Sequence, residues 1–124
     1  KSEYRIEEYN WLLAAEYADS AGADVINGSL GYSTFSDKTM NYNYQDMNGK
    51  VTVVSQAAEM AVERGIIVVV SAGNEGNGSW KYVTSPADAP GVLAVGSVNP
   101  DGSRSSFSSV GPTSDGRVKP DVMA

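Results

Sequence analysis

Apolar positions recur with the spacing of an α-helix in two stretches of this chain. The first, over residues 6–21, has an apolar stripe made of Ile6, Tyr9, Leu13 and Tyr17 and widened by Leu12 and Ala14. The second, over residues 49–64, repeats more regularly, at Val54, Ala57, Ala58, Ala61 and Val62. Both patterns predict amphipathic helices. Gly22 and Gly65 are suited to end these helices, and Asp46 or Asn48 can cap the start of the second.

Shorter apolar runs predict strands. They cover residues 24–27, 66–70 and 92–98, and Pro120 favours an extended conformation over 118–124. The run 66–70 is apolar at every position, which is typical of a parallel strand that is buried on both faces. The order of the helices and strands predicts an α/β fold with a parallel sheet.

Two glycine-rich segments come just after two of the predicted strands: 28–31 follows the strand at 24–27, and 73–78 begins three residues after the end of the strand at 66–70. In open parallel sheets, ligands bind beyond the carboxyl ends of the strands. We therefore expect these two segments to form facing walls of one cleft. A long polar connection over residues 32–48 precedes the second helix, and a connection of this length is usually functional or an insertion.

Composition narrows the function further. The chain has 124 residues, enough for one small domain or part of a larger one, and its net charge of −6 argues against nucleic acid and anionic membranes as partners. No apolar run is long enough to span a membrane, and the lack of cysteine excludes disulfides and thiolate sites. There is also no histidine. These residues therefore supply no imidazole that could activate a serine or cysteine nucleophile.

Three candidate sites lack a part that their chemistry requires. A phosphate-binding loop at 73–78 needs a helix directly after its glycines, and the pattern of residues 79–86 is not helical. Ser29 lacks the glycine two positions earlier that a nucleophile elbow needs. Asp46 begins a segment that resembles a calcium-binding loop, but Ala57 stands where such a loop has its glutamate.

Asn74 is the strongest candidate for chemistry. It follows a predicted buried strand, and Gly73 and Gly76 allow the backbone to turn sharply around it. A side-chain amide in this position can donate hydrogen bonds into a cleft, as an oxyanion hole requires. An asparagine that satisfies backbone groups of a turn explains the same pattern, so position alone leaves both interpretations open.

Several segments together resemble subtilisin-like serine proteases. They are DVINGSLG at residues 24–31, VVSAGNEG at 69–76, SPADAPGVLAVG at 85–96, SSFSS at 105–109 and KPDVMA at 119–124. The resemblance implies a three-layer, parallel-sheet α/β fold, with residues 1–124 forming a partial peptidase domain. Asn74 would be the oxyanion-hole residue of that domain.

The resemblance also implies how a protein or peptide substrate is bound. One wall of the site would be Ser29, Leu30 and Gly31, which would pair with the peptide backbone as an added strand. The facing wall would be Ala72, Gly73 and Glu75, with Glu75 at the rim favouring some basic or polar side chains. The floor would be Thr84, Ser85, Pro86 and Ala87, with a cis peptide bond before Pro86.

The catalytic Asp, His and Ser of the family belong to segments that do not match this chain. We therefore expect a middle segment of a secreted serine endopeptidase that is inactive in isolation. Such an enzyme requires no cofactor, although the parent could hold structural calcium. Because the family's sheet continues on further strands, we expect an uncovered strand edge, an uncovered apolar helix face, and a dimer or swapped assembly of the isolated chain.

Two other functions are compatible with the residues alone. A non-catalytic module that binds peptides or partners could keep the pocket without the triad. An α/β nucleotide-binding domain would need phosphate binding at residues 73–78.

Overall fold

The computed structural model describes residues 2–124. Two helices, α1 (Ile6–Ser20) and α2 (Val53–Glu63), pack on a sheet of β1 (Val25–Gly28), β2 (Ile67–Ser71), β3 (Leu93–Gly96) and β4 (Val122–Met123). Short 3-10 helices, η1 (Lys38–Met40) and η2 (Tyr44–Asp46), lie in the connection before α2. The strands are all parallel and lie in chain order, with β1 at one edge. The predicted parallel α/β fold is confirmed.

Both long helices end at the predicted glycines. Gly22 has φ +80 and Gly65 has φ +91, a left-handed conformation that glycine adopts without strain. After α1, the Ala23 N–H donates to the Ala18 carbonyl at 3.0 Å, and after α2 the Ile66 N–H donates to the Ala61 carbonyl at 3.2 Å. These bonds close both helices with the same glycine-dependent cap.

The start of α2 differs from the prediction. Thr52 is the N-cap, and its hydroxyl accepts a hydrogen bond from the Ser55 N–H at 3.2 Å. Asp46 belongs to η2, and the Asn48 side chain accepts instead from the Lys50 N–H at 2.9 Å. The prediction of Asp46 or Asn48 was therefore wrong, because the intervening residues form turns of their own before the helix begins.

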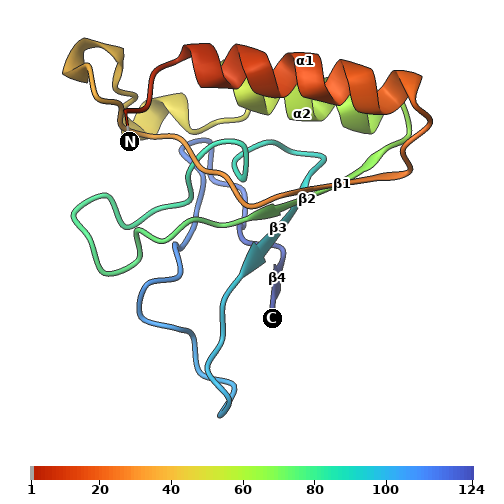
Figure 1. The fold of residues 1–124 in the computed structure, drawn as a ribbon. Helices are drawn as coiled ribbons and strands as arrows, with labels where there is room; N and C mark the ends of the chain where they lie inside the picture. The colour runs from red at the N-terminus through yellow and green to blue at the C-terminus, as the bar shows by residue number, and fades with distance from the viewer. Residues whose placement is uncertain (1) are drawn as a thin grey trace.

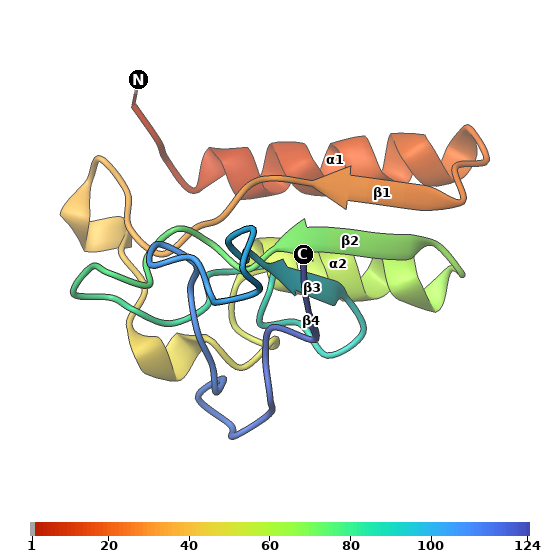
Figure 2. The same cartoon turned by 90° about the horizontal axis from the view of Figure 1, so that it is seen from below.

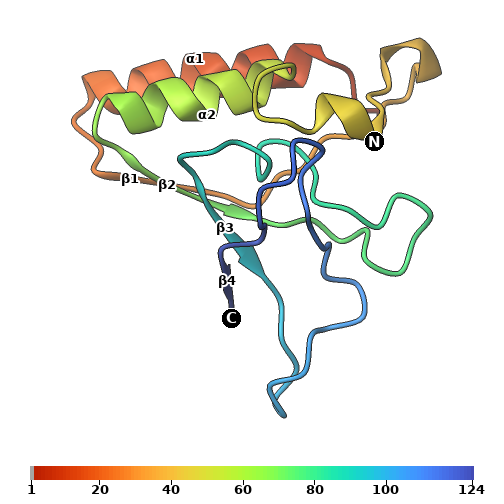
Figure 3. The ribbon, with the colours of Figure 1, turned by 180° about the vertical axis from the view of Figure 1, so that it is seen from behind.

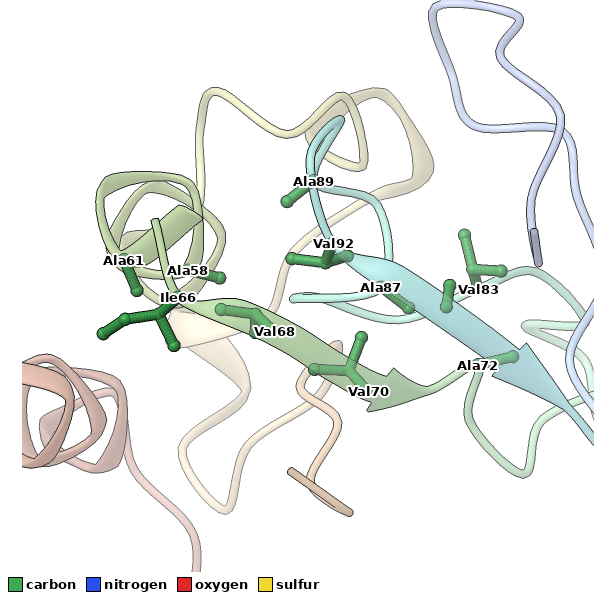
Figure 4. Packing of buried hydrophobic residues seen from close by; sticks show 11 residues of the cluster. Ala58, Ala61, Ile66, Val68, Val70, Ala72, Val83, Ala87, Ala89 and Val92 are labelled. Carbon is green, nitrogen blue, oxygen red and sulfur yellow. The ribbon is translucent and has the colours of Figure 1, made fainter. Parts of the chain in front are cut away.

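The main core lies between α2, the sheet and the segment before β3. Val68 and Val70 of β2 are each 1 % exposed and belong to one buried cluster with Ala58 and Ala61 of α2 (Figure 4). The buried cluster consists of Ala58, Ala61, Ile66, Val68, Val70, Ala72, Val83, Ala87, Ala89, Val92 and Ala94. The regular pattern over residues 49–64 therefore predicts the buried side of α2 correctly.

Only one face of the sheet is covered by helices within residues 2–124. Figures 1 and 2 show α1 and α2 on the same side of the strands. On the opposite face, Ile67 is 58 % exposed and Val25 is 53 % exposed. Within residues 2–124, the prediction that β2 is buried on both faces was therefore wrong, because no helix covers its second face.

The apolar stripe of α1 also faces outward. Ile6, Tyr9, Leu13 and Tyr17 are all exposed, whereas Ala15 and Glu8 are buried on the inner side. The expected uncovered helix face is therefore present. The expected uncovered strand edge is present too, because β1 has a neighbouring strand on one side only. Among residues 2–124, neither helix has the length and apolar character needed to cross a bilayer.

The connection before α2 has a small core of its own. It is built from Tyr32, Phe35, Tyr42, Met47 and Val54. The buried Glu8 carboxylate accepts hydrogen bonds from the Tyr42 hydroxyl at 2.7 Å and the Val54 N–H at 3.0 Å. Burial and this bond to Glu8 raise the pKa of Tyr42 above its usual value. The segment that looks like a polar loop in sequence is thus anchored to both helices.

Candidate functional site

A cavity of about 160 Å³ opens at the carboxyl ends of β1 and β2. We call it the polar cleft, and its lining consists of Glu3, Ser29, Gly31, Ser33, Thr34, Ser71, Gly73, Asn74, Glu75 and Thr84. The glycine-rich segments after the two strands therefore form facing walls, as their positions predict. In Figure 3 the chain runs from these strand ends toward the side where the N-terminus lies.

A sharp turn after β2 creates the second wall. The Ala72 N–H still donates to the Val95 carbonyl at 2.8 Å, but Gly73 then takes φ +107. A Cβ at Gly73 would lie 2.8 Å from Thr84 Oγ1 and 2.9 Å from Ser109 Oγ. Glycine is needed here both for the backbone conformation and for the close approach of the floor.

Ser109 holds the turn on both sides of Asn74. Its N–H donates to the Gly73 carbonyl at 3.0 Å, and its hydroxyl accepts from the Glu75 N–H at 3.0 Å. The Gly76 N–H donates to the Phe107 carbonyl at 2.8 Å. Because residues 107–109 satisfy these groups, the backbone of the turn has partners other than the Asn74 side chain.

Asn74 itself is exposed and lies on the boundary of two cavities. The second cavity, of about 340 Å³, opens on the helix-free face of the sheet; we call it the open hollow. Its lining includes Asn27, Ser29, Val95 and Phe107 together with Asn74. An amide in this position can reach a ligand that extends from the polar cleft into the open hollow.

The floor segment is fixed by hydrogen bonds to the loop after β1. The Tyr32 N–H donates to the Ser85 carbonyl at 2.8 Å, and the Ser85 hydroxyl donates to the Tyr32 carbonyl at 2.9 Å. The Ser85–Pro86 peptide bond is cis, as the resemblance implies. Thr84 lines the polar cleft, whereas Ser85, Pro86 and Ala87 are buried beneath it and do not.

A buried carboxylate ties the same segment to α2. Asp88 is fully buried, and it accepts hydrogen bonds from the Gly49 N–H at 2.8 Å and from the Ser55 hydroxyl. Burial raises the pKa of Asp88, and these hydrogen bonds partly oppose the rise. The floor is therefore positioned by contacts on both of its ends.

The structure brings together six of the residues singled out from sequence. They are Ser29, Gly31, Gly73, Asn74, Glu75 and Thr84. Ala72 is buried and borders the open hollow instead. Leu30 is 48 % exposed and lies outside the lining of both cavities.

Four lining residues were not predicted. Ser71 ends β2 and could have been found, since it lies two residues before the glycine-rich segment 73–78. Glu3, Ser33 and Thr34 reach the polar cleft only through the packing of α1 and the residues after β1. No local motif marks them. Within residues 2–124, no three side chains of the metal-binding types gather closely enough to hold a metal ion.

Comparison with known proteins agrees with this geometry. The model of the subtilase family, Peptidase_S8, matches residues 3–124. Subtilisin NAT of Bacillus subtilis subsp. natto is 41% identical over 106 residues, which cover 84% of this chain and 24% of that protein. Subtilisin-like protease 1 of Trichophyton equinum is 38% identical over 109 residues, covering 86% of this chain and 18% of that protein. The chain thus spans a quarter or less of these relatives.

Solved structures give the same likeness. The self-cleaved protease domain of PatA is 28% identical, with a TM-score of 0.66, over 86% of this chain and 35% of that chain. A cold adapted subtilisin-like serine proteinase is 26% identical, with a TM-score of 0.62, over 91% of this chain and 33% of that chain.

Proposed function

The chain belongs to the subtilase family, and from that premise we propose that it forms the substrate-binding and oxyanion-stabilising part of a serine endopeptidase. The observation that carries the proposal is the position of Asn74. It is an exposed amide on the boundary between the polar cleft and the open hollow, on a turn that Ser109 fixes.

In this proposal a peptide substrate lies along Ser29, Leu30 and Gly31 as an added strand. The side chain before the cleaved bond enters the polar cleft, and the carbonyl of that bond faces Asn74. A serine hydroxyl attacks the carbonyl carbon, and its proton passes through a base to the departing amine. Asn74 donates to the oxygen that becomes negative. Water then releases the acyl group.

This proposal requires the attacking serine and the base to lie in the open hollow. The chain contains no histidine, so a histidine base must come from another segment of the protein. We infer that residues 1–124 alone bind peptide without cleaving it. No step uses a cofactor or a metal ion, and we propose an extracellular or cell-surface location, as suits a protease of this family.

The test compares the full-length protein with the 124-residue segment. We expect the full-length protein to hydrolyse an unstructured protein substrate and to be inactivated by a sulfonyl fluoride, which modifies activated serines. We expect the segment to show neither behaviour. Hydrolysis by the segment alone would refute the inference that it binds peptide without cleaving it. A full-length protein that binds peptide but is inactive would favour a non-catalytic binding module.

We also propose that the isolated segment associates through its uncovered surfaces. Val25 and Ile67 on the open face and the free edge of β1 offer apolar area and unpaired backbone groups. Light scattering of the segment should therefore give a mass of at least twice 13.1 kDa. A monodisperse monomer at high concentration would contradict this expectation.

A further inference from the structure

The segment over residues 105–109 supports the turn that carries Asn74, although it belongs to no helix or strand. Its Phe107 carbonyl accepts from the Gly76 N–H, and Ser109 bonds to the backbone on both sides of Asn74. An irregular segment lacks the repeating backbone hydrogen bonds that keep a helix or strand in shape. Another contact must therefore hold residues 105–109 in place if they are to fix the turn.

The side chain of Arg104 supplies this contact through one nitrogen. Arg104 Nη1 donates to the Ser108 carbonyl at 2.6 Å. It also donates to the Ser105 carbonyl at 3.1 Å and the Ser106 carbonyl at 3.3 Å, so three acceptors share its two hydrogens. Hydrogen bonds from a charged donor are stronger than those between neutral groups. Because the three carbonyls converge on one nitrogen, the shape of the chain over residues 105–108 depends on the guanidinium.

The same part of the chain lies directly against the turn. A Cβ at Gly76 would clash with the Ser108 carbonyl and would lie 2.8 Å from Arg104 Nη1. Ser108 is 1 % exposed, and its hydroxyl accepts from the Ser97 N–H at 3.0 Å. Arg104 and the turn therefore meet at one buried carbonyl, and a shift of the guanidinium should reach the turn.

The sheet holds Arg104 itself in position. Arg104 forms an isolated antiparallel bridge with Val98, and the Ser105 N–H donates to the Ser97 carbonyl at 2.9 Å, directly after β3. Among residues 2–124, no carboxylate forms an ion pair with Arg104. Arg104 also lies outside the lining of the polar cleft and of the open hollow. Its charge is therefore directed at backbone carbonyls rather than at either cavity.

From these contacts we propose that Arg104 is a positioning residue for the oxyanion hole. The guanidinium fixes residues 105–108, and this segment fixes the turn through Phe107 and Ser109. The turn then aims the Asn74 amide at the oxygen that becomes negative. The inference rests on the protease function proposed above. Because the amide acts in the transition state, loss of its positioning should lower kcat more than it weakens substrate binding.

The experiment measures kcat and KM of the full-length protein on one unstructured peptide. Arg104→Ala should lower kcat about tenfold and change KM by less than about twofold. The inhibition constant of a peptide boronic acid, whose tetrahedral serine adduct uses the same amide, should rise by the factor by which kcat falls. Added guanidinium ion at millimolar concentration should restore part of kcat, since it can occupy the space that the side chain leaves.

Further variants separate positioning from general destabilisation. Arg104→Lys keeps the charge but not the planar group, so it should lower kcat only about threefold. In a protein that already carries Asn74→Ala, Arg104→Ala should have little further effect on kcat, because both changes act through the same amide. Arg64→Ala is the matched control, since it removes the same charge from an exposed residue at the end of α2. It should leave kcat unchanged.

The outcomes separate this inference from the function on which it rests. An unchanged kcat in Arg104→Ala, or a loss confined to KM, would overturn the positioning role. An equal loss in the Asn74→Ala background would also overturn it, since Arg104 would then act elsewhere. If Arg104→Ala does not fold, Arg104→Lys carries the test, and an unchanged kcat in that variant would be the contradicting result. Failure of the unsubstituted protein to hydrolyse any peptide would instead overturn the protease function.

Discussion

The two faces of the sheet differ sharply although they share the same strands. On the face toward the helices, Val68 and Val70 are each 1 % exposed, whereas their neighbour Ile67 on the other face is 58 % exposed. Alternate residues of one strand therefore face different surroundings. The covered face supplies the buried apolar area on which stability depends, and the open face borders a hollow with Asn74 on its rim.

The difference between the two faces shows at which positions of this fold a functional side chain can meet a ligand. Groups on the covered face are fixed by packing and cannot meet a ligand. Groups at the carboxyl ends of the strands are positioned by that packing but remain accessible to a ligand. Asn74 is of this second kind, because Ser109 fixes its backbone neighbours while its side chain stays exposed.

The largest expected effect separates activity from stability. In the full-length protein, Asn74→Ala should lower kcat by about 10²–10³-fold, a range that comes from removal of an oxyanion-hole donor in a subtilisin. KM and the midpoint of urea unfolding should change little, since the side chain is exposed. Asn77→Ala, four positions beyond Gly73 on the same exposed turn, is the control and should retain activity. Equal losses in both variants would contradict the assignment.

The second prediction tests the covered face against the open face within β2. Val68→Ala should lower the free energy of unfolding by about 2 kcal/mol, because it leaves a cavity in the core. Ile67→Ala removes a larger side chain but should cost about 0.5 kcal/mol or less in the monomeric segment, measured at concentrations below those at which it associates, because that residue is exposed in the monomer. Urea unfolding of both variants measures the contrast. Similar costs would show that the open face is covered in solution.

The smallest effect concerns the support behind Asn74. Ser109→Ala removes the acceptor of the Glu75 N–H and should lower kcat about tenfold, a cost typical of one buried hydrogen bond. KM should be nearly unchanged, since Ser109 lies outside the lining of the polar cleft. Its effect should be much reduced in a protein that already carries Asn74→Ala, because both changes act through the same amide. Additive losses would show that Ser109 acts elsewhere.

The sequence predicts the fold well where the pattern is local and regular. The stripe of α2 and the glycines that end both helices are correct because short-range spacing and left-handed turns determine them. The stripe of α1 predicts a helix but not its buried side, since Glu8 is buried and Tyr17 is exposed. Which face is covered depends on packing partners, and α1 packs on α2 through its other side.

The sequence predicts some residues of the site and not others. Asn74, Glu75 and Ser29 are adjacent to glycine-rich strand ends, so topology alone places them at one rim. Glu3 and Ser109 could not be found from sequence, because long-range hydrogen bonds and packing bring them to the site. Thr84 was assigned to the floor through the family resemblance, but the lack of a partner for its hydroxyl is visible only in the structure.

The most direct test of the account is a crystal structure of the full-length protein with a peptide boronic acid, which forms a tetrahedral adduct with an activated serine. The account predicts the adduct in the open hollow, with Asn74 Nδ2 within hydrogen-bonding distance, about 3 Å, of its oxygen. The peptide should pair with residues 29–31, and its last side chain should enter the polar cleft. An adduct whose oxygen meets other donors while the Asn74 amide points away would contradict the central claim.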